Sequence, residues 1–108
     1  MNSINCIIRL LEIPIIKLYQ NKIPFAKFKV ELGPTRNHKN NAIIEAQVWG
    51  DLAYDIKKYY HVNDYLIIEG YFSISSLLKD SKLENKLVKL YIYRFYPYFV
   101  KKLENKKF

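Results

Sequence analysis

Hydrophobic and polar residues alternate with a period of two along most of the chain, and this pattern predicts β-strands. The clearest example is residues 25–32, where apolar side chains point to one face and Lys27 and Lys29 point to the other. In residues 42–49, Trp49 lies opposite the apolar face. The pattern predicts five strands in all, at residues 4–13, 25–32, 42–49, 65–74 and 87–95.

The apolar spacing becomes helical after residue 50. Leu52 and Ile56 fall on one side of a short predicted helix over residues 52–60, and Asp51 precedes it as a candidate N-cap. Gly70 interrupts the 65–74 strand, where we expect a bulge or a bend. Polar stretches predict turns and loops at residues 20–22, 33–41, 63–64 and 75–86, the last of which is expected to be a long hairpin loop.

Three strands, a helix and two further strands therefore follow one another. Five antiparallel strands with one helix between the third and the fourth are the element order of the OB-fold, a barrel that closes on itself. We predict an all-β protein with a single OB-fold domain over residues 1–97. Residues 98–108 are a basic tail in which no element is predicted and which we expect to fray.

The charge balance favours a polyanionic partner. Eighteen Lys and Arg residues against ten Asp and Glu give a formal net charge of +8 over 108 residues. Isoleucine, asparagine, lysine and tyrosine make up nearly half of the chain, however, and all four are encoded mainly by A/T-rich codons. The composition therefore indicates an A/T-rich genome, such as that of an organelle, a parasite or a low-GC bacterium, and the charge alone does not define the partner.

Several classes of protein are disfavoured by what the sequence lacks. The single cysteine, Cys6, forms no intramolecular disulfide, and Cys6, His38 and His61 do not supply four zinc ligands. No apolar run approaches the ~20 residues of a membrane span, and no secretory signal is expected, which favours an intracellular, reducing compartment. No catalytic triad, paired carboxylates or glycine-rich phosphate loop is visible. We therefore predict a binding protein that is not an enzyme and uses no cofactor or metal.

Three consecutive stretches resemble one protein family. Residues 48–53 read Val-Trp-Gly-Asp-Leu-Ala, residues 59–64 read Tyr-Tyr-His-Val-Asn-Asp, and residues 65–72 read Tyr-Leu-Ile-Ile-Glu-Gly-Tyr-Phe. They are similar to the aromatic–Gly–x–Leu–Ala element, the helix end and the Val-x-Ile-Glu-Gly-x-Leu strand of the bacterial and organellar single-stranded DNA-binding proteins. The resemblance covers roughly residues 3–95 and suits a diverged relative encoded in the plastid of an alga.

The resemblance implies an OB fold that binds single-stranded DNA without sequence preference, as a homodimer or homotetramer. It also implies a role in DNA replication, repair or recombination, in the plastid or otherwise in the cytoplasm or nucleoid. In such proteins flat rings accept any base, and lysines and arginines follow the phosphates. The candidate binding residues are outward aromatic residues and the cations of the second strand, the loop and the hairpin: Trp49, Lys27, Lys29, Arg36, Lys39, Tyr71, Lys79 and Lys82.

The chain also departs from the family pattern. Of the stacking aromatics only the one before the central glycine is kept, as Trp49, while Ile43 and Leu77 stand at two other positions. Glu45 stands where the family tends to place a cation. The glycine-rich tail with an acidic, Phe-terminated tip has no counterpart in residues 98–108, so we expect no partners of the kind that recognise that tip.

Two other functions stay open at this point. The same departures fit a protein-interaction module, that is, a diverged OB domain that has lost its DNA surface and serves as a subunit of a replication or gene-expression complex. Trp49 would then be buried against a partner instead of stacking on a base. RNA binding is the other alternative, because stacking and phosphate contacts serve both polymers.

Overall fold

The computed structural model describes residues 3–33, 42–79 and 83–98, with all of their side chains except those of residues 75–79 and 83–87. The elements follow the predicted order. They are β1 (Ile4–Leu10), β2 (Ile15–Tyr19), β3 (Ile23–Leu32), β4 (Ile43–Trp49), α1 (Asp51–Tyr59), β5 (Tyr65–Lys79) and β6 (Leu83–Pro97).

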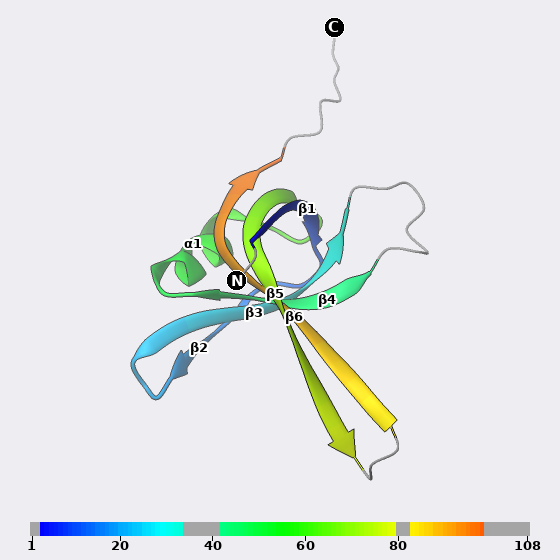
Figure 1. Cartoon of the computed structure of the whole chain (residues 1–108). Coiled ribbons are helices and arrows are strands. Elements are labelled where there is room, and N and C mark those ends of the chain that lie inside the picture. The colour runs from blue at the N-terminus through cyan, green and yellow to red at the C-terminus, as the bar shows by residue number, and fades with distance from the viewer. Residues whose placement is uncertain (1–2, 34–41, 80–82, 99–108) are drawn as a thin grey trace, which may run out of the picture.

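Five of these strands close a barrel, with the helix between β4 and β5 (Figure 1). β1 pairs with β5, β5 with β6, β6 with β4 and β4 with β3, and β3 returns to β1 where Ile8 lies opposite Leu32. The predicted barrel is thereby confirmed. The pairing of β4 with β6 is parallel, whereas we predicted only antiparallel strands. Strand directions cannot alternate around a closed ring of five, so at least one neighbouring pair must be parallel.

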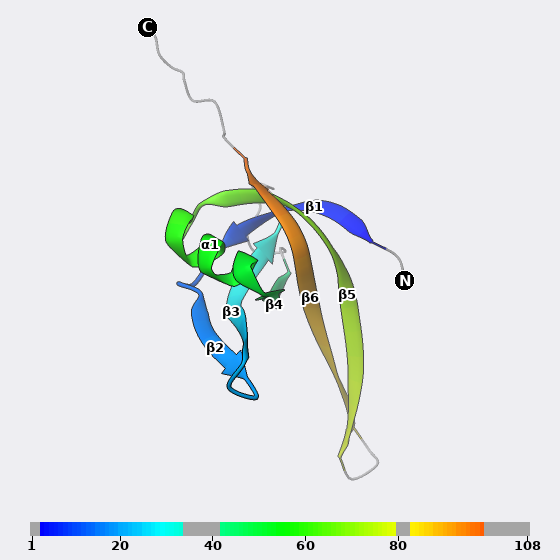
Figure 2. The ribbon, with the colours of Figure 1, turned by 90° about the vertical axis from the view of Figure 1, so that its left-hand side faces the viewer.

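The barrel interior is filled by alternate residues of the strands, and this confirms the apolar faces predicted for residues 25–32 and 42–49. α1 packs on β3 and β4 (Figure 2). It contributes Ala53 and Ile56 to the interior. The buried hydrophobic residues of the described chain are Ile8, Leu10, Ala26, Phe28, Val30, Ala46, Val48, Ala53, Ile56, Leu66, Ile68, Leu90 and Ile92. Cys6 is half-buried and packs against this core, and burial raises the pKa of its thiol.

The start of the helix differs from the prediction. Gly50 is the N-cap, Asp51 is the first helical residue, and no side chain caps this terminus. Gly50 has a φ of 80°, which glycine adopts without strain. The Asp51 carboxylate instead lies in the first turn, where the helix dipole favours a negative charge.

The strand boundaries differ in two places. β1 ends at Leu10 rather than at residue 13, and residues 15–19 form the separate strand β2, which pairs with the start of β3. The larger difference is the loop predicted at residues 75–86, which was wrong. β5 and β6 stay paired as far as Lys79 opposite Leu83, and they leave the barrel together as an arm (Figure 1). Strands beyond the barrel have no core against which to alternate, so a polar sequence there is compatible with pairing.

The irregularity predicted at Gly70 is confirmed. The register of β5 against β6 shifts between Glu69 and Gly70. A Cβ atom on residue 70 would lie 2.2 Å from the backbone oxygen of Tyr91, closer than real contacts allow. Glycine is therefore required here by the close approach of the two strands.

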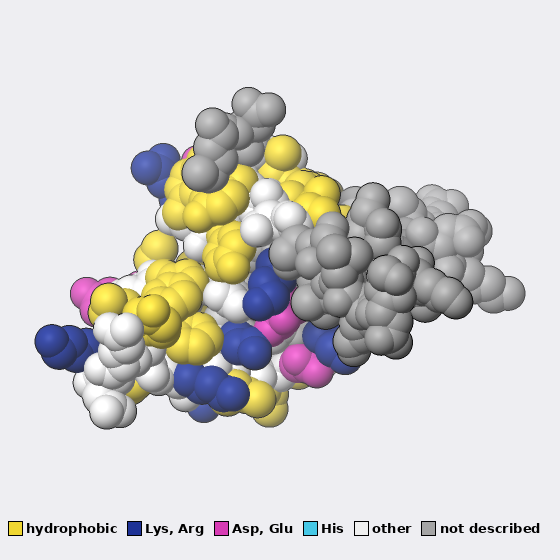
Figure 3. Space-filling model, turned by 60° about the horizontal axis from the view of Figure 1, so that its bottom comes forward, with side chains coloured by type: hydrophobic (Ala, Val, Ile, Leu, Met, Phe, Trp, Pro, Cys, Tyr) yellow, Lys and Arg dark blue, Asp and Glu magenta, His cyan; other side chains and the backbone are white. Residues whose placement is uncertain are grey.

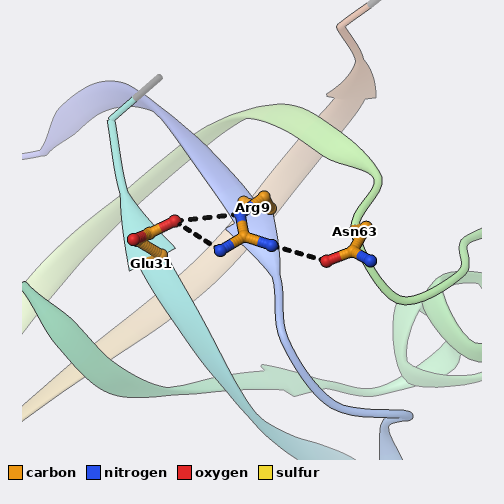
Figure 4. A network of polar contacts seen from close by, with 3 residues as sticks. All are labelled: Arg9, Glu31 and Asn63. Carbon is orange, nitrogen blue, oxygen red and sulfur yellow. Dashed lines mark hydrogen bonds and ion pairs between the residues drawn. The ribbon is translucent and has the colours of Figure 1, made fainter. Parts of the chain in front are cut away.

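A polar network fastens β1 to its neighbours (Figure 4). Nε and Nη2 of Arg9 lie 2.9 and 2.8 Å from Oε1 of Glu31 on β3, and Nη1 donates to Oδ1 of Asn63 in the turn before β5. Glu31 is only 3% exposed. The guanidinium group thus supplies charged hydrogen bonds to a carboxylate that would otherwise be costly to bury.

Within the described part of the chain, no helix is long and apolar enough to span a membrane. The same residues contain no group of three or more His, Cys, Asp and Glu side chains placed to hold a metal ion. Most of the predicted tail, residues 99–108, lies outside the described residues.

Candidate nucleic-acid interface

The outward side chains of five neighbouring strands form one continuous surface, which we call the outer strand face. Residues paired across adjacent strands point to the same side of a sheet. The strand pairings therefore arrange the outward residues in rows that run across the strands. The central row crosses β2, β3, β4, β6 and β5 as Ile15, Lys27, Gln47, Tyr91 and Tyr71. The rows on either side of it are Lys17, Phe25 and Trp49, and Lys29, Glu45, Lys89 and Ser73.

Trp49 lies at the end of β4 and is 38% exposed. One face of its indole stacks on Phe25, with ring centroids 4.6 Å apart and an interplanar angle of 19°. The ring of Tyr19 meets it edge-on at 5.7 Å, and Nε1 donates to Oε1 of Gln47 at 3.1 Å. These contacts hold the indole in one orientation while a large part of it stays open.

The open side of Trp49 borders a cavity of about 480 Å³ on the outer strand face. Tyr71 and Tyr91 lie opposite each other on β5 and β6 and stack with centroids 5.4 Å apart. The cavity is lined by Trp49, Leu52, Tyr71, Tyr91, Ile92 and Tyr93. Its walls therefore consist largely of aromatic rings, which suit the flat face of a base.

A second cavity of about 280 Å³ on the same face, which we call the lysine cleft, is lined by three lysines and two glutamates together with Ile15 and Phe28. Nζ of Lys27 lies 3.2 Å from Oε2 of Glu45, and both side chains are partly exposed. The backbone N–H of Lys29 donates to Oε1 of Glu12 at 2.9 Å, while its side chain stays exposed. Lys17 is the third lysine of the lysine cleft, beside Lys27 and Lys29.

The two cavities differ in chemistry but belong to one surface, because β4 contributes Trp49 to the first and Glu45 to the second. A space-filling view shows hydrophobic side chains gathered beside Lys and Arg side chains on one face, with Asp and Glu among the latter (Figure 3). Such a surface offers rings to bases and ammonium groups to phosphates, and its acidic residues reduce the local positive charge.

The structure brings four of the predicted residues together, namely Trp49, Lys27, Lys29 and Tyr71, all on the outer strand face. Lys79 is the last residue of β5, on the arm, and the structure describes its backbone but not its side chain. Arg36, Lys39 and Lys82 lie outside the described residues.

Further residues of this surface were not among the candidates. Tyr19, Phe25 and Tyr91 contact the predicted aromatic residues, and Lys17 and Lys89 add positive charge. The alternation in β3 and β6 marks Phe25, Lys89 and Tyr91 as outward positions. Their proximity to Trp49 and Tyr71 depends on strand register, which the alternation does not supply.

No family model matches the chain. Two curated proteins are similar to it, one over almost its whole length and the other over about two thirds. The chain is 29% identical over 107 residues to the "Putative single-stranded DNA-binding protein ycf41" of Trieres chinensis, covering 96% of this chain and 95% of that protein. It is 31% identical over 71 residues to the "Thylakoid-associated single-stranded DNA-binding protein slr1034" of Synechocystis sp., covering 66% of this chain and 55% of that protein.

Two solved structures share the fold. The SSB domain of a Synechococcus sp. protein matches with a TM-score of 0.69 and 23% identity, over 88% of this chain and 93% of that one. The small single-stranded DNA-binding protein of Streptomyces coelicolor matches with a TM-score of 0.74 and 13% identity, over 90% and 95%. The closed barrel with its single helix therefore defines an OB-fold protein. The resemblance of residues 48–72 to the single-stranded DNA-binding protein family is therefore confirmed, and the similarity to a protein of that name extends over 96% of this chain.

Proposed function

We propose that this chain binds single-stranded DNA without sequence preference through the outer strand face. Trp49, Tyr71 and Tyr91 stack on bases, and the lysines of β2, β3 and β6 follow the phosphates. The observation that carries the proposal is the position of the aromatic cavity beside the lysine cleft on one surface. A DNA strand that runs from β3 across β4 to β6 meets both cavities.

The finer assignments extend this proposal. The A/T-biased composition and the two relatives named above support a plastid location, with a role in replication, repair or recombination. The family resemblance supports a homodimer or homotetramer. The chain acts by binding alone, without a cofactor.

The test uses the intrinsic fluorescence of Trp49, which is the only tryptophan. Oligo-dT is titrated at low and at moderate salt. We expect quenching, because a base stacks on the open side of the indole, and a midpoint that weakens with salt, because phosphate contacts release counterions.

A Trp49→Ala variant then measures the share of stacking, with labelled oligo-dT and fluorescence anisotropy as the readout. Loss of one stacking contact is expected to cost about 1–3 kcal/mol of binding free energy. Tyr54→Ala is the matched control, because Tyr54 is an exposed aromatic residue of α1 outside both cavities. Binding unaffected by Trp49→Ala would remove this residue from the site, and an absence of any binding would remove the function.

Two observations favour a second candidate function. Glu45 engages Lys27, and Phe25 covers one face of Trp49, so the surface is less open and less basic than its residue types suggest. A protein-interaction module of a replication or gene-expression complex has no need of free lysines. It predicts no binding of oligo-dT at any salt concentration. The same titration with oligo-U separates DNA binding from RNA binding.

A further inference from the structure

A third cavity lies away from the outer strand face, where α1 ends and β5 begins. Its volume is about 300 Å³. It is lined by Tyr59, Tyr60, Asp64, Tyr65, Pro97 and Tyr98, and we call it the tyrosine pocket. Four of its six residues are aromatic, and Asp64 is the single charged residue of this lining.

The rings of the tyrosine pocket are set at angles to one another. Tyr65 and Tyr98 meet nearly at right angles, with centroids 6.4 Å apart, and the N–H of Tyr98 donates to the backbone oxygen of Tyr65 at 3.0 Å. Tyr60 packs edge-on against Phe95 at 5.5 Å, which fixes its ring. Tyr59 is 61% exposed and can adjust to a ligand. Aromatic rings arranged around a space attract a cation through the negative potential of their faces.

The carboxylate of Asp64 gives the tyrosine pocket its charge preference. Its Oδ2 accepts a hydrogen bond from the backbone N–H of His61 at 2.8 Å, so the group is held in place while its side chain stays 43% exposed. Burial, and to a smaller extent this carboxylate, raise the pKa of the Tyr60 phenol. A negative charge here attracts cations and repels phosphates, so the pocket selects against the backbone of nucleic acids.

The protein already places one cation on a ring of this pocket. Nζ of Lys58 lies 5.2 Å from the centroid of the Tyr59 ring. Lys57 belongs to the same last helical turn, and Nδ1 of His61 lies 3.8 Å from Oδ2 of Asp64. A cationic ligand therefore competes with Lys58 for Tyr59, whereas Tyr65 and Tyr98 carry no such contact in the described residues.

The tyrosine pocket is separate from the candidate DNA site. Tyr65 and Tyr71 are both on β5, six positions apart, which corresponds to about 20 Å along an extended strand. The 9 residues of α1, which extend about 14 Å along the helix axis, follow Trp49 and end at Tyr59. Repulsion by positive charges farther than about 8 Å away is screened at physiological salt, so Lys58 is the nearby cation against which the attraction of the Asp64 carboxylate has to act.

We propose that the tyrosine pocket binds the guanidinium group of an arginine side chain presented by a basic segment of a protein partner. Arginine suits it better than lysine because its planar group stacks on rings while it donates hydrogen bonds to a carboxylate. The size of the cavity fits one side chain. The ligand is thus opposite in charge to the one proposed for the outer strand face, and both can be bound at once.

The test is an NMR titration of the tyrosine ring signals with a blocked Gly-Ser-Arg-Ser-Gly peptide. The control peptide has citrulline in place of arginine, which keeps the shape and removes the charge. We expect saturable shifts of the pocket tyrosines with the arginine peptide, and binding of the citrulline peptide weaker by about fivefold or more.

Variants of the protein sharpen the test in both directions. Asp64→Asn keeps a hydrogen-bond acceptor for His61 and is expected to weaken binding by about fivefold, while Lys58→Ala removes the competitor and is expected to strengthen it by about twofold. Tyr54→Ala, on the same helix but outside the pocket, should leave binding unchanged.

Three results would overturn the proposal. One is equal binding of the arginine and citrulline peptides. Another is a response to free spermidine but not to the peptide, which would indicate a site for small cations. The third is displacement of the peptide by oligo-dT, which would make the pocket part of a nucleic-acid interface. Because the readout is peptide binding, failure of the DNA-binding proposal leaves this test intact.

Discussion

Glu45 is the single residue with the most direct bearing on the affinity of the outer strand face for DNA, the ligand proposed for it. It lies in register between Lys29 and Lys89, and its carboxylate engages Lys27 at 3.2 Å. A phosphate that approaches Lys27 must displace this carboxylate and meets its negative charge. We therefore expect Glu45 to reduce the affinity for DNA, at a position where the family resemblance implies a cation.

We predict that Glu45→Gln tightens the binding of single-stranded DNA several-fold at low salt. The freed Lys27 then neutralises one more phosphate, so the slope of log K against log salt becomes more negative by about 0.7. The measurement is anisotropy of labelled oligo-dT over a range of salt concentrations. Asp55→Asn is the matched control, since it removes the same charge from an exposed position on α1. Equal effects of the two variants would show that only net charge matters.

Trp49 illustrates how much of the site the sequence supplies. Its outward position follows from the alternation in residues 42–49 and is found in the structure. Its contacts with Phe25 and Tyr19 could not be predicted, because they depend on how β4 pairs with β3 and β3 with β2. Tyr71 is similar: its partner Tyr91 is set by a register that shifts at the bulge.

The bulge in β5 matters at the scale of elements, because it directs how β5 crosses β6. It requires Gly70, where a Cβ atom would meet backbone atoms of Tyr91 and Ile92 at 2.2 and 3.1 Å. Those atoms belong to a paired strand, so they cannot move aside as a flexible side chain would. The barrel and the arm thus depend on one close contact.

We predict that Gly70→Ala lowers the free energy of unfolding by about 2–3 kcal/mol, towards the upper part of the range for overpacking. Gly50→Ala is the comparison. Gly50 has open space around it, but its φ of 80° and ψ of −155° lie in a region essentially restricted to glycine, so the variant is expected to cost about 1–3 kcal/mol through backbone strain alone. Urea unfolding of both proteins measures the difference. A loss below about 1 kcal/mol for Gly70→Ala would contradict the role given to the close contact.

The arm of β5 and β6 shows why some elements escape prediction. Within the barrel, residues 65–74 and 87–95 carry the apolar alternation that a buried face imposes, and both strands were predicted. Residues 75–79 and 83–87 continue the same strands without a core beneath them, so pairing there leaves no such pattern. Hydrophobic periodicity in a sequence indicates which residues are buried. It indicates strand pairing only where one face of the paired strands is buried.

At the scale of the whole molecule, the network of Arg9, Glu31 and Asn63 ties together three segments that are distant in the sequence. Arg9 is on β1, Glu31 on β3 and Asn63 in the turn before β5. These are the segments whose pairing closes the barrel. Alternation places Glu31 on an outward face, so its burial was not predicted.

We predict that Arg9→Met destabilises the protein by about 2–4 kcal/mol, at or below the range for breaking a fully buried ion pair, because Arg9 is partly exposed. The loss arises from a buried Glu31 deprived of the guanidinium group. The double variant Arg9→Met, Glu31→Met should recover most of the stability, since apolar pairs replace buried ion pairs at little cost. Urea unfolding is again the measurement, and additive losses in the double variant would refute this account.

The strand order of the barrel has a consequence for how the protein is made. β1 is synthesised before the other strands, yet it pairs with β5, which comes late in the chain. Likewise, β4 pairs with β6, which is synthesised last of the strands. Pairings between residues so far apart along the chain belong to high contact order, for which folding takes milliseconds to seconds. Trp49 and Tyr91 come from β4 and β6, so their cavity forms only when these two strands meet. A nascent chain that ends before β6 therefore has neither a closed barrel nor the surface proposed to bind DNA, and both are acquired in the same late step of folding.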